Sequence, residues 1–196
     1  MMKKIFAIFC LLVATLFCWQ PQADAKAIAV IPMGWGTNYP TCTDDQYLRD
    51  LMVKIVKEHA PSGYTITCSK QLDETYDDAL HQGYYHKDFA SAYGYDYVIL
   101  IFASPIWYET VHFMHPRATF DIHEADQDMT GFLFTPRSDG YNYAVGSHAK
   151  DNNDVRYEDI PDTLFTRGME LIMQNFGHTM KMEDLSKPKL KMSDIL

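Results

Sequence analysis

Three histidines and an aspartate in the middle of the sequence have spacings that could serve a metal ion. His112 and His115 are three positions apart, and Asp121 and His123 are two apart, which puts the second pair on one face of a strand. Zinc and copper take imidazole and carboxylate ligands. However, the chain is acidic, its histidines are scattered, and it has no His-Glu-x-x-His or Cys-x-x-Cys motif. Solvated surface histidines are the favoured interpretation, and a metal-binding domain is an alternative.

Residues 126–131 contain a second possible cation site. Two aspartates, a threonine and Gly131 occupy the first, third, fifth and sixth positions of a calcium-binding loop. The twelfth position, which should be glutamate, is Arg137. A turn ending at Gly131 between two strands explains the same residues, and we predict that turn instead of a cation site.

No motif for a catalytic nucleophile is present. The sequence lacks Gly-x-Ser-x-Gly, and no spacing of serine, histidine and acidic residues singles out a triad. The adjacent aspartates at 44–45 and 77–78 fall near predicted helix starts, where carboxylates stabilise the helix dipole. We therefore predict that the protein is not an enzyme and has no cofactor.

The first 25 residues have the three parts of a secretory signal peptide. Lys3 and Lys4 supply the positive charge, residues 5–17 the apolar segment, and Ala-Asp-Ala at 23–25 a cleavage site. A spanning helix would need about 20 apolar residues. We therefore predict export to the periplasm or the medium, with a mature chain that begins at Lys26. A lipid anchor on Cys18 is disfavoured because the bulky Phe17 precedes it.

The remaining chain has the size of one domain and is acidic. The whole chain has a net charge of −9, and residues 1–25 contribute +1, which leaves −10 for the rest. This charge argues against nucleic acid and anionic lipid as partners, because both need a basic surface. No later segment is long and apolar enough to be an integral membrane segment.

Two cysteines remain after the signal peptide, and we predict that Cys42 and Cys68 form a disulfide. An isolated pair in an oxidising compartment is a disulfide candidate. The predicted strands place both residues at the same edge of the sheet, and closing this loop would stabilise the fold by roughly 3 kcal/mol. The alternatives are two separately buried thiols, or a reduced pair in a species that makes few disulfides.

The hydrophobic pattern predicts one α/β domain over residues 26–180. Apolar or β-branched runs at 27–32, 64–69 and 98–103 predict parallel strands. Helical spacing predicts helices from residue 47 to about 60, over 74–80 and 88–93, and from 162 to Gly177. Residues 117–125 and the run from 132 to 135 predict an added antiparallel hairpin. The expected fold is a three-layer sandwich with a mixed sheet of about five strands and a Lys-rich tail at 181–196.

Residues 97–108 (YVILIFASPIWY) resemble the strand and loop of flavodoxins, in which a Ser-Pro-x-Trp segment lies near the flavin. This resemblance implies, as an alternative, an FMN-binding redox protein in which Trp107 or Tyr108 stacks on the flavin ring. The loop at 33–45 lacks the phosphate-binding pattern of that family.

A second resemblance covers most of the exported chain. The segment Gly-Tyr-Asp-Tyr-Val-Ile-Leu at 94–100 and the later Asp-Met-Thr-Gly at 128–131 are similar to motifs in α/β domains of bacterial envelope proteins. That group includes the N-terminal domain of TolB, the curli secretion protein CsgG and penicillin-binding-protein activator lipoproteins. The resemblance implies a non-catalytic module that binds an envelope protein or cell-surface component.

The predicted binding surface is the carboxyl edge of the parallel strands, where ligands of open α/β sheets bind. It consists of two loops, at 34–41 and 105–116. The predicted anchors are Trp35, Tyr39, Trp107 and Tyr108. Packing of the same aromatic residues over the strand ends is an equal alternative.

Overall fold

The structure is a computed structural model that describes residues 26–33, 46–104, 106–115, 118–151 and 155–186. The predicted signal peptide lies outside the described residues, as do Trp35, Tyr39 and Cys42. None of the described helices has the length and apolar character needed to cross a membrane.

The first half of the described chain is the predicted parallel β-α-β-α-β unit. Strand β1 pairs in parallel with both β2 and β3, so it lies between them. β1 and β3 are almost entirely apolar because both of their faces are covered by helices. The elements are β1 (Ala27–Met33), α2 (Gln46–His59), β2 (Thr65–Thr67), α3 (Lys70–His81), α4 (His86–Tyr93) and β3 (Tyr97–Ala103).

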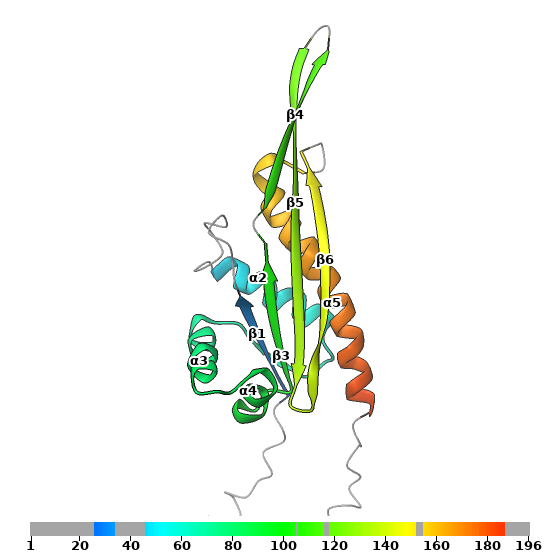
Figure 1. Ribbon diagram of the computed structural model, residues 1–196. Coiled ribbons are helices and arrows are strands. Elements are labelled where there is room, and N and C mark those ends of the chain that lie inside the picture. The colour runs from blue at the N-terminus through cyan, green and yellow to red at the C-terminus, as the bar shows by residue number, and fades with distance from the viewer. Residues whose placement is uncertain (1–25, 34–45, 105, 116–117, 152–154, 187–196) are drawn as a thin grey trace, which may run out of the picture.

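The second half adds three antiparallel strands and a long helix. The long strand β5 pairs with β3 through its second half and with β4 through its first half, while β6 pairs with its other side. The result is a six-stranded mixed sheet (Figure 1). The elements are β4 (Trp107–His115), β5 (Ala118–Thr135), β6 (Ser138–Lys150), the short 3-10 helix η1 (Tyr157–Asp159) and α5 (Ile160–Ser186).

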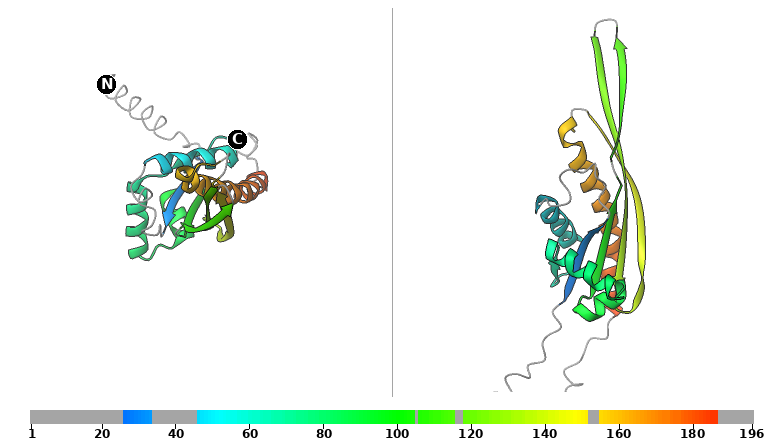
Figure 2. Two further views of the ribbon diagram at one scale, coloured as in Figure 1. Left: turned by 90° about the horizontal axis from the view of Figure 1, so that it is seen from above. Right: turned by 60° about the vertical axis from the view of Figure 1, so that its left-hand side comes forward.

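Helices cover both faces of the sheet, as predicted for a three-layer sandwich. Helices α2 and α5 pack on one face, and α3 and α4 on the other (Figure 2, left). The larger core lies under α5, where seven apolar side chains from Ile160 to Phe176 are fully buried in the same cluster as residues of β3 and β5. The smaller core lies between α3, α4 and the opposite face of β1 and β3.

The predicted turn at residues 126–131 is wrong, because these residues lie inside β5. Gly131 is a close-packing position. A Cβ atom there would lie 2.6 Å from Ile172 Cγ2 and 2.9 Å from Phe176 Cε2. The reversal instead follows Thr135, whose Oγ1 accepts a hydrogen bond from the Arg137 backbone N–H at 3.2 Å. The aspartates that suggested a calcium loop are therefore strand residues.

The predicted end of the last helix at Gly177 is also wrong. α5 continues to Ser186, so the first part of the predicted tail is helical. Gly177 allows α5 to approach α2, since a Cβ atom at this position would lie 2.6 Å from the carbonyl oxygen of His59. The absence of a side chain serves helix packing here and does not end the helix.

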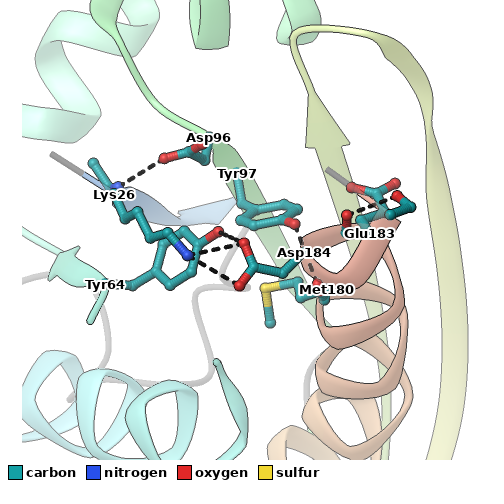
Figure 3. A network of polar contacts seen from close by, with 9 residues as sticks. Lys26, Tyr64, Asp96, Tyr97, Met180, Glu183 and Asp184 are labelled. Atoms are coloured by element: carbon teal, nitrogen blue, oxygen red, sulfur yellow. Dashed lines mark hydrogen bonds and ion pairs between the residues drawn. The ribbon is translucent and has the colours of Figure 1, made fainter. Parts of the chain in front are cut away.

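Polar contacts join the start of β1 to the end of α5 (Figure 3). Lys26 Nζ lies 2.9 Å from both carboxylate oxygens of Asp184, and the Tyr64 hydroxyl donates to the same carboxylate at 3.2 Å. The Tyr97 hydroxyl donates to the backbone oxygen of Met180. The predicted first residue of the exported chain is thus fastened to the last turns of α5.

Candidate functional site

Strand β4 and residues 118–126 of β5 form a two-stranded arm that projects beyond the rest of the molecule (Figures 1 and 2). Its ladder runs from the pair Trp107–Asp126 to the pair His115–Ala118. The β5–β6 ladder starts at Glu124, and the Asp151 N–H donates to the carbonyl oxygen of His123 at 2.8 Å, so residues 118–122 pair only with β4 in the described chain. A two-stranded hairpin is marginally stable in water by itself. We call this element the β4–β5 arm.

The arm replaces the binding loop predicted at residues 105–116. Residues 107–115 are rich in aromatic and β-branched types, and polar and apolar residues alternate from 110 to 113, which favours a strand. The prediction of a loop gave too much weight to Pro105. Ser104 and Ile106 belong to a short connection between β3 and β4, and both of these strands pair with β5.

Trp107 is the most exposed large aromatic residue at the root of the arm. Trp107 is 68% exposed. The register places Trp107 opposite Asp126, and Asp126 lies opposite His148 on β6. His148 Nδ1 is 2.8 Å from Asp126 Oδ1. An exposed indole therefore lies next to a polar pair, a combination common in protein recognition sites.

Tyr108 occupies the opposite face of the arm and packs beside η1. Its ring centroid is 6.1 Å from that of Tyr157, which is 4.5 Å from that of His123. Burial raises the pKa of Tyr108 above its ordinary value. Trp107 and Tyr108 therefore do not form a single anchor, since neighbouring strand residues point to opposite faces. Sequence reasoning missed Tyr157, because no local pattern links it to β4.

The distal part of the arm has apolar residue types at paired positions. The register pairs Val111 with Ile122 and Phe113 with Phe120. Because strand positions alternate between faces, these four positions fall on the same face as Trp107.

The arm also contains the histidines that suggested a metal site. His112 pairs with Asp121, His115 with Ala118, and His123 with Thr110. The side chains of residues 111–122 lie outside the described part of the structure. Among the residues that are described, no group of three histidine, cysteine, aspartate or glutamate side chains is arranged to hold a metal ion. His123 instead contacts Thr110 and Tyr157.

The structure does not support the predicted disulfide. Cys68 is a free thiol next to a largely buried guanidinium, with Arg49 Nη1 at 3.8 Å from Sγ. Burial raises the pKa of the Cys68 thiol to about 11, although Arg49 opposes this shift. The proposed partner, Cys42, lies outside the described residues.

We expect Cys68 to react slowly with iodoacetamide at neutral pH while the protein is folded. Alkylation requires the thiolate, and a pKa of about 11 leaves very little of it. The rate should rise about a hundredfold or more when urea unfolds the chain. Mass spectrometry of the peptide that contains Cys68 measures this rate separately from that of Cys42. Equal rates in the folded and unfolded protein would contradict the buried environment.

No family model and no curated protein matches this sequence. Several solved structures resemble it in part. The lipoprotein GNA1162 from Neisseria meningitidis aligns with 13% identity and a TM-score of 0.42, covering 75% of this chain and 97% of that one. A minor lipoprotein from Acinetobacter baumannii aligns with 7% identity and a TM-score of 0.34, covering 82% and 95%.

The rare lipoprotein B from Shewanella oneidensis aligns with 8% identity and a TM-score of 0.35, covering 82% of this chain and 95% of that one. These three structures are described as lipoproteins of bacteria. Scores this low carry no argument about function, so the functional proposal depends on the sequence and on the arm. The resemblance to the group of TolB and CsgG stays an expectation from the sequence.

Proposed function

We propose that this chain is an exported protein of the bacterial envelope that binds another protein through the β4–β5 arm and performs no catalysis. The observation that carries the proposal is Trp107, an exposed indole at the root of an arm whose strands extend past the remaining sheet. The signal peptide predicted in the first 25 residues supports export.

The composition of the arm supports a protein as its partner. Exposed tryptophan and tyrosine side chains dominate the energetics of protein interfaces, because they bury a large apolar area and also offer a polar atom. Around Trp107 the surface carries Glu124 paired with Lys150 at 2.9 Å, and Asp126 paired with His148. A hydrophobic centre with a charged rim is the usual anatomy of such an interface.

The experiment is affinity purification of the tagged, processed protein from its native envelope after mild cross-linking, with identification by mass spectrometry. A specific envelope protein recovered repeatedly would support the proposal. Recovery of the protein with bound flavin or metal, and without any protein partner, would overturn it in favour of a small-ligand function.

We expect Trp107→Ala to reduce recovery of that partner by about tenfold or more, the loss typical of an interface hot spot. The free energy of unfolding of the Trp107→Ala variant should differ from that of wild type by less than about 0.5 kcal/mol, because the Trp107 side chain is exposed. Tyr85→Ala is the matched control. Tyr85 is also exposed, at 62%, but it lies at the start of α4. Equal recovery of the partner by wild type and Trp107→Ala would exclude the arm root as the docking site.

A further inference from the structure

In the described chain three strands pair on one side only: β2 with three residues, β4 with nine and β6 with thirteen. β4 belongs to the projecting arm, so β6 is the longest edge of the sheet body. A short edge strand offers little to another chain, whereas a long one presents a row of backbone N–H and C=O groups. β6 is therefore the edge at which an additional strand would be expected.

Hydrogen bonds between Asp128 of β5 and Ser104 establish which backbone groups of β6 point outward, that is, away from β5. The Ser104 N–H donates to the carbonyl oxygen of Asp128 at 2.8 Å, and the Asp128 N–H donates to Ser104 Oγ at 3.0 Å. Both backbone groups of Asp128 thus point away from β6. Since these directions alternate along an antiparallel strand, Gln127 and Met129 point toward β6.

The register then assigns the directions along β6. Gln127 pairs with Ser147 and Met129 with Val145, so the backbone groups of these two β6 residues point inward. The N–H and C=O groups of Asn142, Ala144, Gly146 and His148 point outward. Independent support comes from Arg167, whose Nη1 donates to the carbonyl oxygen of His148 at 2.8 Å.

The outward groups of Asn142, Ala144 and Gly146 have no hydrogen-bond partner within the part of the chain that the structure describes. The surrounding segment, residues 141–147 with the sequence Tyr-Asn-Tyr-Ala-Val-Gly-Ser, has no charged residue and no proline. Charges and prolines are the usual means by which edge strands avoid pairing with other chains. A short uncharged segment of this kind is favourable for strand pairing.

We propose that β6 pairs in antiparallel fashion with β6 of a second copy of this chain, with Ala144 opposite Ala144 at the two-fold axis. Ala144 is the midpoint of the uncharged segment, so this register pairs the segment with itself. Asn142 then lies opposite Gly146, and both present outward backbone groups. Tyr143 lies opposite Val145, an aromatic and β-branched pair of the type that stabilises sheets.

An exposed leucine on α5, close to Ala144 of β6, favours a second copy of the chain as the partner of this edge. Leu171 of α5 is 41% exposed and lines a groove beside Gly146 and His148. Along α5 it lies between Gly168, which packs against Met129, and Ile172, which packs against Gly131. In the β5–β6 register, Met129 pairs with Val145 and Gly131 pairs with Tyr143, and these two β6 residues lie on either side of Ala144.

The two-fold axis through Ala144 therefore passes near Leu171. It would place the α5 helices of the two copies next to each other, running in opposite directions, with Leu171 near Leu171. The interface would be isologous, which is the commonest symmetry of homodimers. The pairing extends the sheet of one copy into that of the other and satisfies the outward backbone groups of both.

Sedimentation equilibrium of the processed protein tests this proposal. We expect a reversible dimer, and we expect Ala144→Lys to raise its dissociation constant by about tenfold or more, because a charge at the axis faces its own copy. The control is Asp77→Lys, at an exposed position on α3, which should leave the dissociation constant unchanged. A monomer at every concentration, or a dimer that Ala144→Lys does not weaken, would overturn the proposal.

Cross-linking tests the register separately and does not depend on the stability of the lysine variant. Residues directly opposite each other in a hydrogen-bonded antiparallel pair have Cα atoms about 5.5 Å apart, within the range for a disulfide. Ala144→Cys should therefore form a disulfide-linked dimer under mild oxidation. Asn142→Cys, which faces Gly146 in this register, should not. Equal cross-linking of both variants, or of neither, would contradict the pairing.

Discussion

Replacing Phe176 with alanine is expected to lower the free energy of unfolding by about 3–5 kcal/mol. Phe176 is fully buried in the core between α5 and the sheet. Its ring lies against the backbone of Gly131, where a Cβ atom would be only 2.9 Å from Cε2. Removing the ring would leave a cavity that the neighbouring strand cannot fill, because position 131 has no side chain to move into it.

Urea unfolding followed by circular dichroism measures this effect. Leu185→Ala is a suitable control because Leu185 is in the same helix but exposed, so its substitution should change stability by less than about 0.5 kcal/mol. If both variants lost a similar free energy, packing of α5 on β5 would not be the main contribution to the core. The loss of about 3–5 kcal/mol expected for Phe176→Ala is a large fraction of the 5–15 kcal/mol by which a typical domain is stable.

The parallel half of the fold could be predicted because its signals are local. The apolar runs that became β1 and β3 and the helical spacing of α2 each lie within one short segment. Strands covered by helices on both faces need to be apolar throughout, so burial leaves a continuous pattern in the sequence. The α/β sandwich follows from the order of these elements.

The antiparallel half was harder to predict because its glycines have long-range roles. Gly131 resembles the end of a turn, but the reason for a glycine there is the approach of Ile172 from α5. Gly177 resembles the end of a helix, but it accommodates the backbone of His59 in α2. Both partners are far away in the sequence, so a local interpretation assigned a break at each position.

The candidate site was predicted only in part for the same reason. The sequence singled out Trp107 and Tyr108 as exposed aromatic residues, and the structure places both at the root of the arm. It could not indicate that they point to opposite faces, because that depends on whether the segment is a loop or a strand. Nor could it indicate Tyr157, which reaches Tyr108 through the tertiary fold.

Removal of the Asp73 carboxylate should lower the free energy of unfolding by about 3 kcal/mol. Arg49 Nη2 lies 2.6 Å from Asp73 Oδ2, and the Arg49 side chain is only 7% exposed. Asp73→Ala would leave this guanidinium without its carboxylate in a site from which water is largely excluded. A charge left buried without its partner costs far more than an exposed ion pair contributes.

A double variant separates the loss of the ion pair from the loss of side-chain packing. In Arg49→Met with Asp73→Leu, apolar groups of similar length replace both charges, and stability should recover to within about 1 kcal/mol of wild type. Burial raises the pKa of Asp73, and Arg49 opposes the shift, so the carboxylate is itself costly to keep charged. Its Oδ1 atom is buried and accepts no hydrogen bond from the described residues.

Asp77→Ala is the control for loss of a carboxylate from the same helix, because the Asp77 side chain is exposed. It should change stability by less than about 0.5 kcal/mol. A double variant as unstable as Asp73→Ala would show that the shape of these side chains, and not the unpaired charge, accounts for the loss. Recovery in the double variant would instead show that the unpaired charge of Arg49, which lies between α2 and the start of α3 beside the Cys68 thiol, accounts for the loss.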